Sequence, residues 1–140
     1  MAQEVQALNV WLRATLLADA TLAGLIGSRL FVGDLAPQGV TFPYLRMEVL
    51  SAIDVNAIPA RRTHSIYIIY LAVVTLQVNT AQQAAIMDRV DTVLQAAGAT
   101  SGSYRFDVLR ESQVGPLQSN VEGVVYSEMG AQYRCWVRPV

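Results

Sequence analysis

The sequence predicts one α+β domain over residues 1–140: an antiparallel sheet with a long hairpin and two helices packed on one face. Three observations predict this class. Residues 63–78 form the longest apolar run and are rich in Ile, Val, Thr and Tyr, which favour strands. A capped helix signal follows this run directly. The predicted order of elements is helix, strand, hairpin, helix and two strands, which is typical of sheet and helices in separate layers.

The first quarter of the chain predicts a helix that breaks. Apolar side chains recur with the helical period over residues 3–18. Asp19 has the character of a new N-cap and Gly27 that of a stop, so a bend is expected where the first helix ends. A short strand over residues 29–32 and a loop over residues 33–41, which contains Gly and Pro, follow.

The centre of the sheet is predicted to be a long antiparallel hairpin. A strand over residues 42–53 is joined by a turn over residues 54–62 to the apolar run at 63–78. Both period-two faces of that run are apolar, so we expect it inside the sheet and covered on both sides. Its extended length of about 50 Å exceeds the width of about 30 Å for such a domain, so one end should protrude or bend.

The second half begins with the clearest helix signal. Residues 80–97 follow the helical period, and Thr80 and Gln83 fit a capping box. The helix is expected to stop at Gly98, and a flexible link over residues 99–103 follows. Two strands are then predicted, over residues 104–114 and 124–137, joined by a polar loop over residues 115–123. We expect a bulge or bend in the last strand at Gly130.

Composition excludes several function classes. The net charge is −1, and no basic run is longer than Arg61-Arg62, whereas a surface that grips nucleic acid needs a basic stripe. No apolar segment reaches the roughly 20 residues of a membrane-spanning helix, and the N-terminus does not resemble a signal peptide. The single cysteine, Cys135, excludes an internal disulfide and a cysteine-based zinc site.

No pattern in the sequence predicts catalysis, and we expect no cofactor, no metal and no enzyme activity. His64 is the only histidine and lies beside two arginines without a predicted partner. Asp88 and Asp91 lie three residues apart on the predicted helix, but that spacing is more typical of a solvated helix face. The phosphate-binding, hydrolase and zinc-protease motifs are absent.

The two-faced central strand instead predicts association. The sheet face away from the helices would carry Tyr67 or Tyr70 with their apolar neighbours, and the chain has no third predicted helix to cover it. Hydrophobic content is high at 53%, and charged content is low at 15%. Because large exposed apolar patches mark interfaces, we expect this face to be buried by another subunit.

Several short segments, in order, resemble a known family. The stretch LLADATLAGLIGSRLFVGDLAPQGVTFPYLRMEVLS at residues 16–51 contains a leucine- and glycine-rich turn, an APQG loop at 36–39 and a PY strand start at 43–44. A helix pattern at residues 83–90 and the closing strand YRCWV at 133–137 continue the similarity. This order resembles the tail terminator, or tail completion, proteins of long-tailed bacteriophages.

The resemblance implies a structural virion protein rather than an enzyme. Such proteins form a ring, usually a hexamer, at the head-proximal end of the tail tube, where they end tube polymerisation and join the tail to the neck. The implied partners are further copies of the chain, the tail tube protein and a head-completion or stopper neck protein. Double-stranded DNA would be only passing cargo in the channel. The implied location is the virion, after assembly in the host cytoplasm, without a membrane or cofactor.

A head-to-tail ring uses two unlike patches on each subunit. We expect one patch on the exposed sheet face and the other on the helix side or the hairpin tip. Removing both tip charges, Arg61 and Arg62, should then weaken docking while the domain still folds. The residues predicted to contact partners are Asp34, Pro37, Gln38, Asn56, Arg61, Arg62, Tyr67 and Tyr70.

Two alternatives stay open at this point. The first is another neck, baseplate or head-completion component with a related fold, which only the identity of its partner would distinguish. The second is a small soluble α+β ligand-binding domain or enzyme, which would be a monomer or dimer with a closed pocket.

Overall fold

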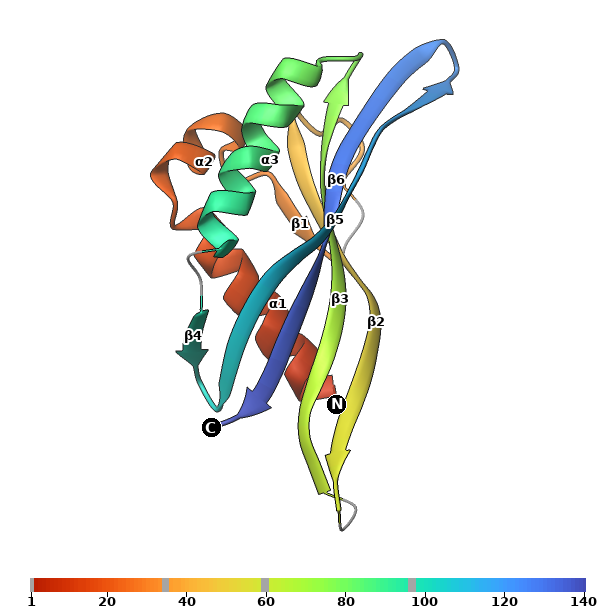
Figure 1. Ribbon diagram of the computed structural model, residues 1–140. Helices are drawn as coiled ribbons and strands as arrows, with labels where there is room; N and C mark the ends of the chain where they lie inside the picture. The colour runs from red at the N-terminus through yellow and green to blue at the C-terminus, as the bar shows by residue number, and fades with distance from the viewer. Residues whose placement is uncertain (1, 34–35, 59–60, 96–97) are drawn as a thin grey trace.

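A computed structural model describes residues 2–33, 36–58, 61–95 and 98–140 (Figure 1). Within these ranges, three helices lie on one face of a curled, mostly antiparallel sheet, which confirms the α+β class. The elements are α1 (Ala2–Leu17), α2 (Ala20–Ile26), β1 (Leu30–Val32), β2 (Tyr44–Ala57), β3 (Arg61–Leu76), α3 (Thr80–Gln95), β4 (Gly98–Ser101), β5 (Tyr104–Val121) and β6 (Val124–Pro139).

The sheet is built around β3. The strand order is β1-β2-β3-β6-β5-β4, so β3 lies between β2 and β6 and is antiparallel to both. Only β1 pairs in parallel, with β2. The prediction that the long apolar run forms an internal strand is therefore confirmed.

The core lies between this sheet and the helices. Tyr67, Ile69, Leu71 and Val73 alternate along β3 and are fully buried beneath the helical layer. In the same core, above strand β5, Trp11 of α1 stacks on Phe106 of β5 with 4.8 Å between ring centroids and 9° between planes. This contact fixes α1 across the sheet.

The predicted break of the first helix is confirmed, and it explains why three helices are present where two were expected. Asp19 is the N-cap of α2, and its Oδ2 accepts a hydrogen bond of 2.8 Å from the Leu22 N–H. Gly27 ends α2 with a φ of 62°. Arg89 of α3 donates to both Asp19 carboxylate oxygens, at 2.8 and 2.5 Å. One aspartate therefore both caps α2 and joins it to α3.

The Asp19 carboxylate should make the stability of the domain depend on acidity. The hydrogen bonds from Arg89 and from the Leu22 N–H lower its pKa from the ordinary 3.8 to about 2. A depressed acid pKa contributes stability that is present above the unfolded value and lost as the pH falls toward the folded value. We expect Asp19→Asn, which keeps the capping oxygen, to lose less stability than the wild type between pH 4 and pH 2. Urea unfolding across that range measures the difference, and parallel curves would contradict the assignment.

Two segments predicted as loops are instead strands. The turn expected over residues 54–62 is shorter, because β2 continues to Ala57 and β3 begins at Arg61. The polar loop expected over residues 115–123 is also wrong, since β5 continues to Val121 and β6 begins at Val124. Backbone ladder bonds can hold a polar strand when it projects into solvent, so polarity alone was a poor guide here.

The connection between β5 and β6 is a two-residue turn. Glu122 and Gly123 have φ values of 52° and 82°, as type I′ hairpin turns require. The Gly123 N–H donates to Asn120 Oδ1 at 3.0 Å, which fixes the tip. The link expected over residues 99–103 also differs, because β4 occupies most of it and pairs with β5.

Gly130 lies at an irregularity of the sheet, as predicted, but the extra residue is in the neighbouring strand. Gly130 pairs with Val114 at the register shift of the β5–β6 ladder, which lies in β5 between Val114 and Leu117. The pairing of β6 with β3 is regular at this residue, which lies opposite Ala72. Gly130 is also a point of close approach, since a Cβ there would lie 2.5 Å from the Leu71 carbonyl oxygen.

The sheet extends beyond the helices at both ends (Figure 1). The β2–β3 hairpin projects at one end, which confirms the expected protrusion. The β5–β6 hairpin projects at the opposite end and was not predicted. The molecule thus carries two extended hairpins on one central sheet.

Candidate assembly surfaces

Some of the predicted contact residues do lie on the surface. Pro37 and Gln38 are exposed in the loop before β2 and, with Phe42 and Tyr126, line a surface pocket of about 340 Å³. Asn56 is exposed near the tip of the β2–β3 hairpin. Asp34 lies outside the described residues, and of Arg61 only the backbone is described. The loop and the hairpin tip are separate surfaces.

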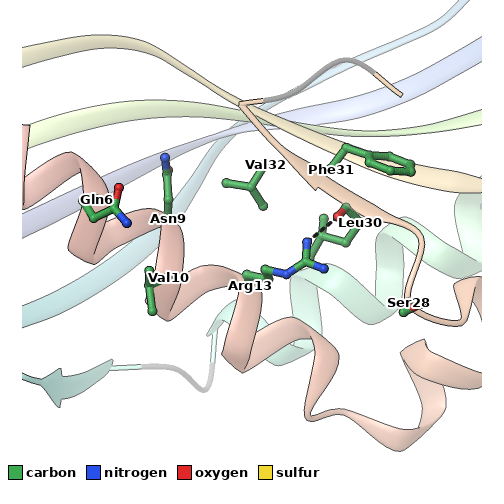
Figure 2. A pocket seen from close by; sticks show the side chains of 8 residues that line it. All are labelled: Gln6, Asn9, Val10, Arg13, Ser28, Leu30, Phe31 and Val32. Carbon is green, nitrogen blue, oxygen red and sulfur yellow. Dashed lines mark hydrogen bonds between the residues drawn. The ribbon is translucent and has the colours of Figure 1, made fainter. Parts of the chain in front are cut away.

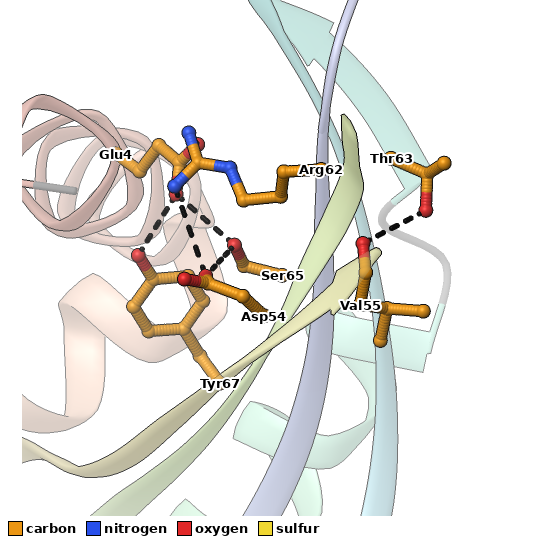
Figure 3. A network of polar contacts seen from close by, with 7 residues as sticks. All are labelled: Glu4, Asp54, Val55, Arg62, Thr63, Ser65 and Tyr67. Carbon is orange, nitrogen blue, oxygen red and sulfur yellow. Dashed lines mark hydrogen bonds and ion pairs between the residues drawn. The ribbon is translucent and has the colours of Figure 1, made fainter. Parts of the chain in front are cut away.

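Arg62 pairs with Asn56 near the tip of the β2–β3 hairpin and belongs to a partly buried polar network (Figure 3). Its Nη2 donates to Glu4 Oε1 of α1 at 2.6 Å, and its Nη1 lies 3.7 Å from Asp54 Oδ1. Ser65 Oγ donates to Asp54 Oδ1 at 2.8 Å and lies 3.2 Å from Glu4 Oε2. Glu4 is only 1% exposed. Arg62 therefore joins the hairpin to α1 rather than presenting a free charge at the tip.

Tyr67 and Tyr70 lie on opposite faces of the sheet. Tyr67 is 0% exposed, and its hydroxyl donates to Glu4 Oε2 at 3.2 Å. Burial and the Glu4 carboxylate raise the pKa of Tyr67 to about 12. Tyr67 thus offers no surface to a partner. Tyr70 is on the face away from the helices, is 8% exposed, and has the Arg46 guanidinium 5.3 Å from its ring centroid.

The sheet face away from the helices carries an apolar patch near the β2–β3 hairpin. Cross-strand register aligns Ile53 with Ile66 and Trp136, and Ile68 with Leu109 across Arg134. Ile53 and Leu109 are exposed, and the other three apolar residues are half-buried. We call this set, Ile53, Ile66, Ile68, Leu109 and Trp136, the outer patch. No described helix lies on it (Figure 1).

The β5–β6 hairpin carries a second apolar surface beyond its register shift. We call residues 117–126 the arm. Leu117 and Val121 are 54% and 55% exposed, and Val124, which pairs with Val121, is also exposed. Alternation places these three side chains on one face of the arm. Glu122 at the tip is the only charged residue in the arm.

A groove lies between α1 and the edge strand β1 (Figure 2). It has a volume of about 460 Å³ and is lined among others by Gln6, Asn9, Val10, Arg13, Phe31 and Val32. The Arg13 side chain crosses from α1 and its Nη1 donates to the Leu30 carbonyl oxygen at 2.5 Å. β1 is the last strand at its end of the sheet, so one of its edges meets no other described strand. We call this the α1–β1 groove.

The titratable groups considered in the sequence do not converge on one site. His64 Nδ1 lies 3.0 Å from the Thr63 hydroxyl. Asp91 accepts from the Tyr133 hydroxyl at 3.3 Å, whereas Asp88 is exposed. Burial raises the pKa of the Cys135 thiol to about 12, so it stays protonated at neutral pH. Within the described ranges, no three His, Cys, Asp or Glu side chains are grouped so that they could hold a metal ion.

Sequence reasoning missed the arm, the α1–β1 groove and Glu4. The Glu122-Gly123 pair between valines was a usable hairpin signal, because such turns favour glycine at a positive φ. The groove and Glu4 have no comparable signal, since each depends on how α1 crosses the sheet. None of the described helices is long and apolar enough to cross a membrane.

A sheet covered by helices on one face, with two projecting hairpins that expose aliphatic side chains, is typical of a protein that associates through its surfaces. The model of a family described as Tail completion protein gp17 matches residues 10–138. The chain therefore belongs to the tail completion protein family and is a structural protein of a phage-type virion.

Solved structures show the same fold. Seventeen of their chains match. One, from a structure titled "Virion of native gene transfer agent (GTA) particle", is 19% identical with a TM-score of 0.77, and the match covers 95% of this chain and 96% of that chain. Curated protein sequences give no match.

Proposed function

We propose that this protein forms a ring at the head-proximal end of the tail tube, where it ends tube polymerisation and joins the tail to the neck. Membership of the tail completion family supports the location. The observation that carries the ring is the presence of two unlike projecting hairpins at opposite ends of one sheet (Figure 1). A head-to-tail ring needs two different patches on each subunit, and the rotation must close.

The proposed partners are further copies of the chain, usually six in a ring, the tail tube protein and a head-completion or stopper neck protein. Exposed Pro37, Gln38 and Asn56 are candidates for contacts with the tube or neck, together with Asp34 and Arg61. The outer patch and the arm supply apolar area for association. With a net charge of −1, the chain would pass double-stranded DNA through the channel rather than grip it.

The proposed ring predicts a definite native mass. Light scattering over a range of concentration and salt should give a species near six times the chain mass of 15.3 kDa, either alone or once tail tubes are added. Added during tube assembly, the protein should shorten tubes and appear at one end by electron microscopy. A compact monomer that never assembles, even with tubes, would contradict the proposal and favour a ligand-binding domain. A protein at this position on the tail would be found finally in the virion, after assembly in the host cytoplasm.

A further inference from the structure

We propose that the arm tip of one copy docks in the α1–β1 groove of the next copy. The inference rests on the proposed ring and names the contact between neighbouring subunits. It commits to a second copy of this chain as the occupant of the groove.

The arm has the properties of an inserted element. It is a two-stranded hairpin that projects from the sheet, and its tip is fixed by the Asn120 hydrogen bond to the Gly123 N–H. One face exposes Leu117, Val121 and Val124 without a cover in the described chain. A rigid hairpin loses little conformational entropy on docking, so its apolar area is available for affinity.

The groove has complementary properties. Val10 is exposed at its rim, and Phe31 and Val32 are half-buried on the β1 side. It has a volume of about 460 Å³, and Figure 2 shows the side chains that line it. The outer edge of β1 meets no other described strand, so an extended segment lying beside it can also form main-chain hydrogen bonds.

Opposite charges on the two surfaces support their pairing. Arg46, Arg62, Arg89, Arg105, Arg110 and Arg134 each form an ion pair within the described chain. Arg13, in the groove, and Glu122, at the arm tip, are both exposed. Neither joins an ion pair among the described residues, which is also true of Arg29, Arg138 and Asp88. Of the described residues that line the groove, Arg13 is the only charged one, and Glu122 is the only charged residue in the arm. Docking the arm tip places these opposite charges together.

The geometry makes the contact intermolecular and directional. Figure 1 shows the arm pointing away from α1 of its own chain. The arm and the groove are different surfaces, so each copy has one of each to offer to two neighbours. Such a heterologous contact is the kind that generates rings.

Single charge reversals should separate neighbouring copies. In Glu122→Arg and in Arg13→Glu, every contact brings two like charges together. We expect the dissociation constant between neighbours to rise about tenfold or more. Light scattering measures the loss of the ring-sized species, with tail tubes present if the wild type assembles only there. Arg13→Gln, which keeps a donor for the Leu30 carbonyl, tests the same charge without removing that hydrogen bond.

Mixing the two reversed variants provides the decisive measurement. In a ring where they alternate, the positively charged arm of each Glu122→Arg copy would meet the negatively charged groove of an Arg13→Glu copy. The unchanged arm of each Arg13→Glu copy would meet the unchanged groove of a Glu122→Arg copy. All contacts in an even-numbered ring are then complementary, so an equimolar mixture should assemble although neither variant does alone. A mixture that stays dispersed would overturn the contact, as would single variants that assemble like the wild type.

Matched controls separate this contact from general charge effects. Asp88→Arg and Arg138→Glu make the same charge changes at exposed residues outside the arm and the groove, and both should assemble normally. Circular dichroism checks that each variant is folded. If the wild type itself never assembles, the proposed ring fails together with the contact. If the wild type assembles and charge reversal has no effect, only the contact fails.

Discussion

Replacing Gly130 with alanine should cost about 3 kcal/mol or more of unfolding free energy, at the upper end for overpacking in a core. The added Cβ would lie 2.5 Å from the Leu71 carbonyl oxygen and 2.8 Å from both Ala72 Cβ and Tyr70 Cε1. The nearest of these atoms belongs to the backbone of β3, which pairs on both sides. Relief therefore requires the central strand to move, and the ladders of β3 with β2 and β6 resist that movement.

A matched control is available in the same chain. At Gly24 in α2, an added Cβ would meet nothing within 4 Å, and alanine has a higher helix propensity than glycine. We therefore expect Gly24→Ala to be neutral or to stabilise by about 0.5 kcal/mol. Urea unfolding measures the free energy of unfolding of both variants. One fixed protein concentration is used throughout, because self-assembly would add a concentration-dependent amount to the apparent stability. Equal stability of Gly130→Ala and the wild type would show that β3 and β6 can separate locally.

The elements that the sequence predicted correctly depend on local signals. Residues 63–78 have branched and aromatic side chains on both faces, which few structures other than an internal strand can accommodate. The helix break at Asp19 follows from a local capping side chain. The helix start at Thr80 was also predicted, but the expected capping box of Thr80 and Gln83 was wrong. Asn79 is the cap, since its Oδ1 accepts a hydrogen bond of 3.1 Å from the Gln82 N–H. Gln83 Nε2 donates instead to Ser127 Oγ at 3.0 Å. In each case the interactions that decide the structure are close together in the sequence.

The elements that were missed depend on distant partners. The arm is polar along much of its length, so its strands are specified by the β5–β6 ladder and a two-residue turn rather than by burial. Either Tyr67 or Tyr70 was expected on the open face, because strand alternation could not tell which face the helices cover, and Tyr67 is the one buried beneath them. Glu4 and Arg62 are 58 residues apart, and nothing local marks a glutamate in an exposed-looking first turn as a buried partner.

That pair changes the expected effect of removing charge from the β2–β3 hairpin. The Glu4 side chain is 2% exposed, and Arg62 supplies its only cationic partner among the described residues. In Arg62→Ala, Glu4 would keep the hydroxyls of Ser65 and Tyr67 but lose its opposite charge, with Asp54 still close by. We expect Arg62→Ala to cost about 3 kcal/mol, at the low end for one partner of a buried pair because Arg62 is itself partly exposed.

A double-mutant cycle tests whether that cost comes from the unpaired carboxylate. Glu4→Gln removes the charge but keeps an acceptor, and should cost about 1–2 kcal/mol. The double variant should then be much more stable than the sum of the two single losses predicts, because no buried charge remains unpaired. Arg138→Ala, at an exposed arginine without a described ion pair, should stay within about 0.5 kcal/mol of the wild type in the same urea unfolding measurement. Additive losses would show that Arg62 acts independently of Glu4.

The contact between Arg62 and Glu4 also changes how the hairpin tip can be tested as a docking surface. Removing Arg61 and Arg62 together was expected to weaken docking while the domain stays folded, but the loss of Arg62 also breaks its contact between the hairpin and Glu4 of α1. A docking defect in the double variant would then mix lost contacts with lost stability. Arg61→Ala alone separates the two, because it should leave the Glu4 network intact, and a docking defect without a change in unfolding free energy would assign the tip to partner contact.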